Sequence, residues 1–235
     1  MTEGALHYAK VRNPQLNTPN YAHGFVVTPG AEPPSRTRFA TEHQYSEHLN
    51  LCHFGSLAKD RSLATILVAL DLLLKKYPEA RDHIRIHAYG AALDSLTLTA
   101  IDQFGFGDVV QAHGRLEKDL SSGLSGRERV IEKMQEADVL ILLHGVGEEC
   151  AEYIPSKLYD YLWTGRPIWA VTHRNPQLNE MLGARNAYLS ASGDDEGVAL
   201  ALEKIWRDWQ QKNLNPATGS PIDVNQAVQK ILETI

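Results

Sequence analysis

Residues 152–168 read EYIPSKLYDYLWTGRPI, and this stretch decides the expected fold. It follows the apolar run 139–143 and a glycine-containing loop, and it leads into a second apolar run that begins at Ile168. Pro155 suits the first turn of a helix, and Gly165 suits the residue that ends one. The segment therefore predicts a strand, a loop, a helix and a second strand in succession, which is typical of α/β proteins.

The same alternation extends in both directions from this segment. Short apolar runs predict six strands, at 49–54, 84–89, 109–112, 139–143, 168–171 and 188–190. Helical periodicity predicts helices at 62–76, 95–104, 128–137, 156–164, 176–182 and 194–210. The expected fold class is α/β, a doubly wound parallel sheet of about six strands that is Rossmann-like, with a further C-terminal helix at 224–235.

Composition divides the chain into three parts. Residues 1–48 are polar and carry five prolines, which predicts an irregular N-terminal arm. Residues 49–212 form the expected Rossmann-like domain, and residues 213–235 form a linker and the C-terminal helix. Because ligands of doubly wound sheets bind outside the carboxyl ends of the strands, the loops at that edge are where a site is expected.

Charge and cysteine usage narrow the function classes. The 23 Lys and Arg against 29 Asp and Glu give a net charge of −6, which disfavours nucleic acid or an anionic membrane as a partner. The two cysteines, Cys52 and Cys150, form no C-x-x-C pair and fit a reducing, cytoplasmic location. The most apolar stretch, 66–74, is too short to span a bilayer.

The first candidate site follows the first predicted strand. Gly55 lets the backbone approach a ligand closely, and Lys59 and Arg61 place cations just before the next helix. Such an arrangement suits a diphosphate. The alternative is an ordinary strand-to-helix turn with solvated cations, because the segment matches neither G-x-G-x-x-G nor a P-loop.

The second candidate is the start of the helix at 156–164. The backbone N–H groups of Ser156 and Lys157 lie in its first turn, where phosphate oxygens can accept them, and Asp160 lies one turn deeper, where a carboxylate suits ribose hydroxyls. A cation at position 157 opposes the helix dipole unless an anion lies nearby. The alternative is a snorkelling Lys157 and a surface Asp160.

This segment resembles the donor-nucleotide-binding segment of many retaining glycosyltransferases of the GT-B fold, the glycosyl transferases group 1 type. In that family two acidic residues are separated by seven others, as Glu152 and Asp160 are here, with Asp160 standing where the family usually has Glu. The resemblance extends over most of 49–209. It implies a C-terminal, nucleotide-sugar donor domain, and it implies that 26–33 is a remnant of the linker from an acceptor-binding domain.

The resemblance also implies a role for each matching residue. Asp160 would bind the donor ribose, and Glu152 would be the catalytic residue that approaches the transferred sugar. The remaining nucleotide-sugar-binding residues comprise diphosphate ligands and a loop that meets the base: Gly55, Ser56, Arg61, Ser156 and Lys157 for the diphosphate, and Arg115 and Leu116 for the base. Ser56 departs from the basic residue that the family often has after this glycine.

The function that follows is transfer of a sugar from a UDP-, GDP- or ADP-sugar to an acceptor, with a separate acceptor-binding domain or chain as partner and self-association through an uncovered cleft face. No cofactor is required, and a divalent cation bound with the diphosphate is compatible. Two alternatives stay open: a catalytically silent nucleotide-sugar-binding module that depends on a partner, and half of a nucleotide-sugar epimerase, for which no acid/base pair is evident.

The ten histidines do not indicate a metal site. His43, His48 and His53 are five residues apart, and His83 and His87 are four apart around a predicted strand, so neither set has zinc-ligand spacing. His144 is the exception in position, since it ends a strand beside the donor loop. A structural role is the more common one for such a histidine, and a catalytic role is the alternative.

Overall fold

The computed structural model describes residues 45–90, 92–217 and 224–233. Six strands form one sheet in the order β3-β2-β1-β4-β5-β6, with all neighbours parallel. The strands are β1 (Leu49–Phe54), β2 (Ile84–Tyr89), β3 (Val110–Gly114), β4 (Val139–Leu143), β5 (Ile168–Thr172) and β6 (Tyr188–Ala191). All six predicted strands are thus confirmed, and the predicted α/β doubly wound class with them.

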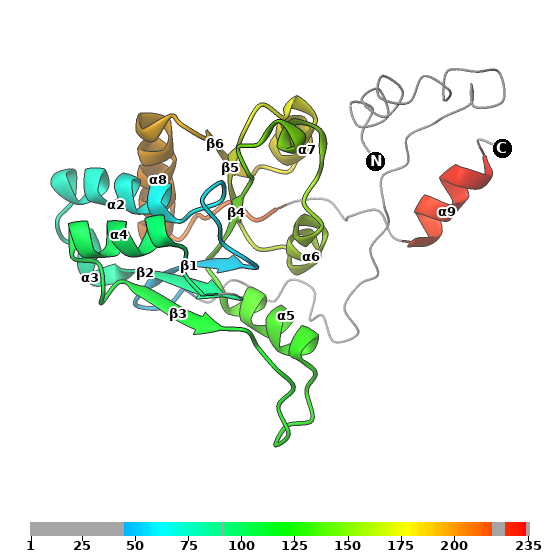
Figure 1. Ribbon diagram of the computed structural model, residues 1–235, viewed down its shortest axis with the longest axis horizontal. Coiled ribbons are helices and arrows are strands. Elements are labelled where there is room, and N and C mark those ends of the chain that lie inside the picture. Colours follow the sequence, from blue (N-terminus) through cyan, green and yellow to red (C-terminus); the bar gives the residue numbers. More distant parts are fainter. Residues whose placement is uncertain (1–44, 91, 218–223, 234–235) are drawn as a thin grey trace.

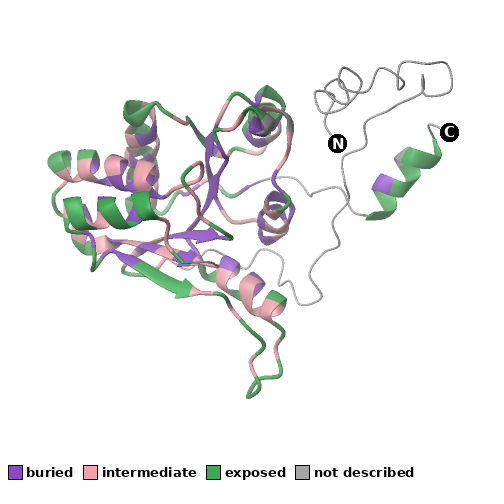
Figure 2. Ribbon diagram, in the orientation of Figure 1, coloured by how far each residue is buried: buried purple, intermediate pink, exposed green. Residues whose placement is uncertain are grey.

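Helices cover both faces of this sheet, as Figure 1 shows. One face carries α2 (Ala64–Lys76), α4 (Ser95–Phe104) and α8 (Asp195–Gln210), and the other carries α5 (Gly126–Glu136), α6 (Lys157–Thr164) and α7 (Pro176–Gly183). Each set buries an apolar stripe against the strands, which makes two separate cores. The central strands β4 and β5 are buried along their whole length (Figure 2), as expected for a sheet covered on both faces.

Three further elements complete the described chain. The short helix α3 (Ala80–His83) precedes β2, the 3-10 helix η3 (Glu148–Glu152) lies in the loop after β4, and α9 (Val224–Leu232) is the C-terminal helix. The sequence pattern did not predict α3 or η3, because four or five residues carry too little periodicity to be recognised.

Helix boundaries differ from the predicted ones by at most three residues, and the caps explain the differences. α5 begins at Gly126 instead of 128 because Ser125 caps it: the Ser125 hydroxyl accepts the Glu128 N–H, and the Glu128 carboxylate accepts the Ser125 N–H. α2 begins at Ala64 instead of 62 because Ser62 lies outside it and its hydroxyl accepts the Ala64 N–H.

The predicted linker packs on the domain over its first five residues. Leu214 and Ala217 are buried, and the Leu214 and Asn215 N–H groups donate to the hydroxyls of Tyr45 and Tyr188 at 3.0 and 3.1 Å. The Ala217 N–H donates to the Arg166 carbonyl at 3.4 Å. The predicted N-terminal arm lies outside the described residues except for Tyr45 to His48.

Candidate functional site

The strand order reverses between β1 and β4, and this is the point at which doubly wound sheets bind ligands. Tyr161 fixes α6 to both strands there: its buried hydroxyl accepts the Phe54 N–H at 3.2 Å and donates to the Ile141 carbonyl at 3.1 Å. One side chain thus sets the height of α6 above the sheet. The first turn of α6 lies beside the loop that follows β1 as a result.

The loop between β4 and α6 is held by polar contacts from outside it. Asn175 is buried, and its side-chain amide donates to the carbonyls of Cys150 and Tyr153 at 3.1 and 2.9 Å while its oxygen accepts the Leu178 N–H of α7. His144 Nε2 lies 3.3 Å from the same Tyr153 carbonyl. Because a carbonyl only accepts, Nε2 carries the proton. These contacts position the residues that lead into α6.

Gly55 ends β1 with φ +116°, a conformation that favours glycine. Its N–H donates to the Tyr89 carbonyl at 2.8 Å, and a Cβ added at Gly55 would lie 3.1 Å from Lys157 Nζ. The next strand ends in Gly90, where an added Cβ would collide with the Gly55 carbonyl. The carboxyl ends of β1 and β2 therefore meet backbone to backbone, and the Lys157 ammonium lies over Gly55.

Lys157 has no acidic partner among the described residues, although its ammonium is largely removed from water. This burial, with the Arg61 charge as a smaller cause, lowers the Lys157 pKa to about 8. The backbone N–H groups of Ser156 and Lys157 also lack a backbone acceptor within the described part of the chain, and no side chain caps α6. Unpaired positive charge is therefore concentrated at the start of α6.

Arg61 adds a second cation to this place. Its backbone closes a tight turn with Ala58, and its Nε lies 3.7 Å from the Asp60 carboxylate, too far for a hydrogen bond. A Cβ added at Gly145, in the loop after β4, would lie 3.4 Å from Arg61 Cγ. The Arg61 side chain also lies near Tyr153, and its charge opposes the rise in the Tyr153 pKa that burial causes. The Arg61 side chain therefore lies at the place where the strand order reverses, between β1 and β4.

His53 is a buried neutral group beside the two cations. Its Nδ1 lies 3.3 Å from the Ile141 carbonyl and so carries the proton, while its Nε2 has no hydrogen-bond partner within the described residues. Burial, and then the nearby Lys157 charge, lower the His53 pKa to about 3. The site therefore gathers cationic and neutral groups, with Asp60 as the carboxylate that lies beside Arg61, and this arrangement favours an anionic ligand.

Asp160 lies one turn further along α6, with 22% of its side chain exposed. Its Oδ1 accepts a hydrogen bond from Arg127 Nη2 at 2.7 Å, and Arg127 lies in the first turn of α5. This ion pair joins α5 to α6. Since the Arg127 side chain is 64% exposed, the pair contributes little to the stability of the fold, on the order of 0 to 1 kcal/mol.

The loop between β3 and α5 is fastened to α5 rather than to the sheet. An added Cβ at Gly126 would collide with the Leu116 carbonyl, so the loop passes directly against the start of the helix. Arg129 donates from Nη1 to the Glu117 carbonyl at 2.6 Å. Arg115 is highly exposed and lies 3.4 Å from the Glu117 carboxylate.

Three stacked rings lie beneath the carboxyl ends of β1, β2 and β3. Phe54 and Tyr89 stack at 4.8 Å and 6° between planes, and Tyr89 and His113 stack at 4.4 Å and 10°. Phe54 lies opposite Tyr89 in the β1–β2 pairing, whereas the β2–β3 register shifts at Tyr89, which lies opposite Gly114. The stack runs from the buried Phe54 to the exposed His113. It gives the loop that follows β3 a rigid base.

The structure brings some of the predicted site residues together and leaves others apart. Gly55, Arg61, Ser156 and Lys157 converge on one place, and Asp160 lies next to it on the same helix. Ser56 is exposed, with no side-chain hydrogen bond to a described residue. No hydrogen bond or ion pair joins Arg115 or Leu116 to α6 in the described residues. Glu152 ends η3, and its side chain lies outside the described part.

The sequence alone did not identify two functional candidates, Arg127 and His53. A signal for Arg127 was present, because it is a cation in the first turn of a helix that begins with the capping pattern Ser125-x-x-Glu128. His53 was grouped with other histidines by spacing, and its burial between the cations depends on three-dimensional packing. The tryptophans Trp169 and Trp206 are fully buried in the core and do not line the site.

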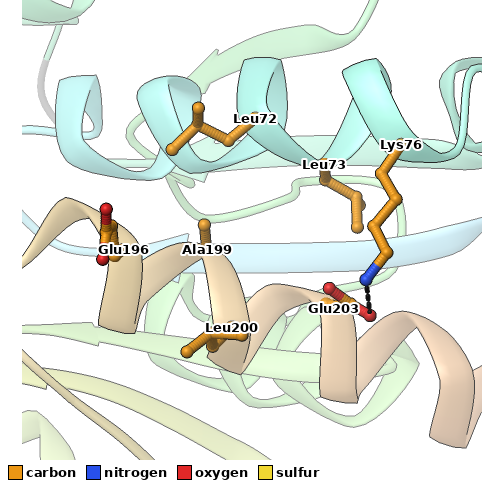
Figure 3. Close-up of a pocket in the computed structure, with 7 residues that line it drawn as sticks. All are labelled: Leu72, Leu73, Lys76, Glu196, Ala199, Leu200 and Glu203. Carbon is orange, nitrogen blue, oxygen red and sulfur yellow. Dashed lines mark hydrogen bonds and ion pairs between the residues drawn. The ribbon is translucent and has the colours of Figure 1, made fainter.

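An apolar groove lies elsewhere, between α2 and α8 (Figure 3). Four apolar side chains line it, with the Lys76–Glu203 ion pair at one end and Glu196 at the other; the apolar residues are Leu72, Leu73, Ala199 and Leu200. It contains none of the residues described above.

Among residues 45–90, 92–217 and 224–233, no group of three or more His, Cys, Asp or Glu side chains is arranged to hold a metal ion. Within the same residues no helix is long and apolar enough to cross a bilayer.

Comparison with known proteins supports the fold rather than a particular activity. No protein-family model matches the sequence, and a search of the curated proteins finds no match. Among solved structures, HepE of Anabaena in complex with UDP is similar at a TM-score of 0.58 and 16% identity, over 80% of this chain and 48% of that one. The pneumococcal O-GlcNAc transferase GtfA, in complex with UDP and GlcNAc, gives 0.56 and 17%, over 88% and 38%.

A third similar structure is the trehalose-6-phosphate synthase OtsA, at a TM-score of 0.53 and 14% identity, over 80% of this chain and 44% of that one. The chain thus spans about half, or less, of the length of each of these glycosyltransferases. The expected resemblance is confirmed at the level of the fold: the described domain is a Rossmann-like α/β domain that matches one half of a GT-B glycosyltransferase.

Proposed function

We propose that this domain binds the nucleoside diphosphate of a nucleotide sugar and serves as the donor-binding half of a glycosyltransferase. The observation that carries the proposal is the Lys157 ammonium, which has no acidic partner among the described residues and lies over Gly55 beside Arg61 at the uncapped start of α6. A diphosphate would supply the missing negative charge. The solved structures of HepE and GtfA, which share the fold, are complexes with UDP, and this makes a UDP-sugar the first donor to test.

Each group has a defined task in this proposal. Lys157, Arg61 and the N–H groups of Ser156 and Lys157 bind the diphosphate, and Gly55 and Ser56 give it room next to β1. In a transfer reaction the bond from the sugar to the diphosphate breaks, and negative charge develops on the departing phosphate oxygen. Fixed cations and N–H dipoles stabilise that charge without reorganising, which lowers the barrier. Glu152 is proposed to approach the transferred sugar.

The nucleoside would lie further along α6. Asp160 is proposed to accept hydrogen bonds from the ribose, and the loop with Arg115 and Leu116 is proposed to meet the base. The spacing from Lys157 to Asp160 is about one helical turn, roughly 5 Å along the axis, which suits the separation of a diphosphate from the ribose attached to it. An acceptor-binding domain or chain would supply the other side of the reaction.

Calorimetric titration with UDP, GDP and ADP tests this proposal directly. We expect one nucleotide to bind, and we expect Arg61→Ala and Asp160→Ala each to weaken it by about tenfold, as loss of a hydrogen bond to a charged group does. Arg81→Ala and Asp108→Ala are matched controls, since that exposed pair also meets at 2.7 Å but lies away from the site. If no nucleotide binds, the donor-binding proposal is wrong.

A second assay separates an enzyme half from a silent binding module. Release of free sugar or transfer of sugar from the donor that binds, measured with and without Asp160→Ala, reports on turnover. Binding without turnover would favour the partner-dependent module, and turnover that the substitution abolishes would favour the enzyme.

A further inference from the structure

Asp160 is held by one of its two carboxylate oxygens. Oδ1 accepts the hydrogen bond from Arg127 Nη2, whereas Oδ2 has no hydrogen-bond partner in the described residues, and part of the side chain remains exposed. A carboxylate held at one oxygen cannot rotate freely, yet it keeps acceptor sites on the other oxygen. The side chain is therefore fixed in orientation before any ligand arrives.

Helix stability does not explain why an arginine occupies position 127. A cation in the first turn of α5 opposes the helix dipole, and the capping box of Ser125 and Glu128 already satisfies the start of this helix. Among the described residues, Asp160 is the one side chain with which Arg127 forms a hydrogen bond or an ion pair. The ion pair with Asp160 is therefore what an arginine at position 127 contributes to this domain.

The same turn of α5 also fixes the loop that follows β3. Gly126 packs against the Leu116 carbonyl, and Arg129 holds the Glu117 carbonyl. Arg127 lies between Gly126 and Arg129 in the sequence, and its side chain binds Asp160 of α6. One helical turn therefore sets the position of a loop and of a carboxylate relative to each other.

We propose that Arg127 is a positioning residue for nucleotide recognition: it holds Asp160 Oδ1 so that Oδ2 accepts a ribose hydroxyl. The inference rests on the proposed function of the domain. Fixing the carboxylate in advance removes the entropy that a free side chain loses on binding, so affinity rises without any contact between Arg127 and the ligand. Arg127 is then specific for the ribose and indifferent to the diphosphate.

Three ligands and four proteins test this assignment by calorimetry. The ligands are UDP, 2′,3′-dideoxy-UDP and inorganic pyrophosphate, and the proteins are the wild type, Arg127→Ala, Arg127→Lys and the control Arg81→Ala. Arg127→Ala is expected to weaken the affinity for UDP by about threefold to fivefold, the upper part of the range that loss of an ion pair of this exposure permits. The same substitution should change the affinities for dideoxy-UDP and for pyrophosphate by less than about twofold. Arg127→Lys should recover part of the UDP affinity, and Arg81→Ala should have no effect.

Each contrary outcome has its own meaning. Wild-type protein that binds neither these ligands nor GDP or ADP overturns the proposed function and this inference with it. Wild-type protein that binds UDP and dideoxy-UDP equally overturns the ribose role. Equal losses for all three ligands in Arg127→Ala would show a direct phosphate contact or a structural defect, and an unchanged UDP affinity would show no role; both outcomes overturn the inference while the proposed function stands.

Discussion

The two neighbouring helices α5 and α6 begin in opposite ways. α5 satisfies its own first turn, because Ser125 and Glu128 bond reciprocally to each other's backbone. α6 has no side-chain cap at Ser156, carries Lys157 in its first turn and leaves that ammonium without an acidic partner in the described residues. Without a ligand, such a helix start lowers the stability of the fold, and a bound anion can restore that stability. Three predictions test this difference between α5 and α6.

The largest effect is expected from Lys157→Met, which keeps the length of the side chain and removes its charge. Nucleotide affinity should fall at least about tenfold, because charge-assisted hydrogen bonds to the diphosphate are lost. The free energy of unfolding should rise by about 1 to 2 kcal/mol at pH 7, because a desolvated charge is removed. Calorimetry and urea unfolding measure the two quantities.

The size of this stability change depends on pH. The Lys157 pKa in the folded protein, about 8, lies below its ordinary value of 10.5, so charging Lys157 costs stability throughout the range below pH 8. As pH rises from 8 toward 10.5 the folded protein loses this proton before the unfolded chain does, and the cost disappears. The stabilisation by Lys157→Met should therefore shrink over that range. A variant that is less stable at pH 7 would instead indicate a packing role for Lys157.

A smaller effect is expected when pH alone is changed. We expect bound diphosphate to raise the Lys157 pKa, so that the ammonium form is the one that binds. Affinity should then fall by about twofold between pH 7 and 8 and by up to about tenfold per pH unit above pH 8. The terminal phosphate is already ionised there, since its second pKa is roughly 6. Titrations from pH 7 to 9.5 measure this slope. In Lys157→Met the slope should be absent, and a slope that persists would assign the titration to another group.

The smallest effect on binding is expected at α5. Ser125→Ala removes the capping box and should lower the free energy of unfolding by about 1 kcal/mol, while UDP affinity changes by less than about threefold. Ser156→Ala is the matched change at α6 and should leave stability within about 0.3 kcal/mol, because Ser156 caps nothing. Urea unfolding of both variants measures the contrast. Equal losses of stability would show that α6 is capped after all.

Much of the fold could be predicted from local pattern. Strands β4 and β5 are continuous apolar runs bounded by glycine and proline, so their existence and type follow from the sequence. The site residues Lys157 and Asp160 could be predicted as candidates because both lie on one helix, where spacing determines direction. The uncapped start of α6 is visible in the same segment.

The features that could not be predicted depend on contacts between segments far apart in the chain. The Arg127–Asp160 pair joins residues 33 positions apart, and nothing local to α5 indicates which way a first-turn arginine turns. His53 lies in a strand whose apolar pattern is equally consistent with an exposed or a buried imidazole. Its neutral state follows only from burial and from cations contributed by two other segments.

The backbone contact between Gly55 and Gly90 has a consequence for how such a site can evolve. Because an added Cβ at Gly90 would collide with the Gly55 carbonyl, Gly90 cannot acquire a side chain without parting the ends of β1 and β2. At Gly55 the φ of +116° makes any side chain strained. Mutation cannot tune ligand preference there. We expect changes in ligand preference between relatives to arise instead in residues 56–61 and 115–125. Exposed side chains there can be exchanged while the ends of β1 and β2 stay in place.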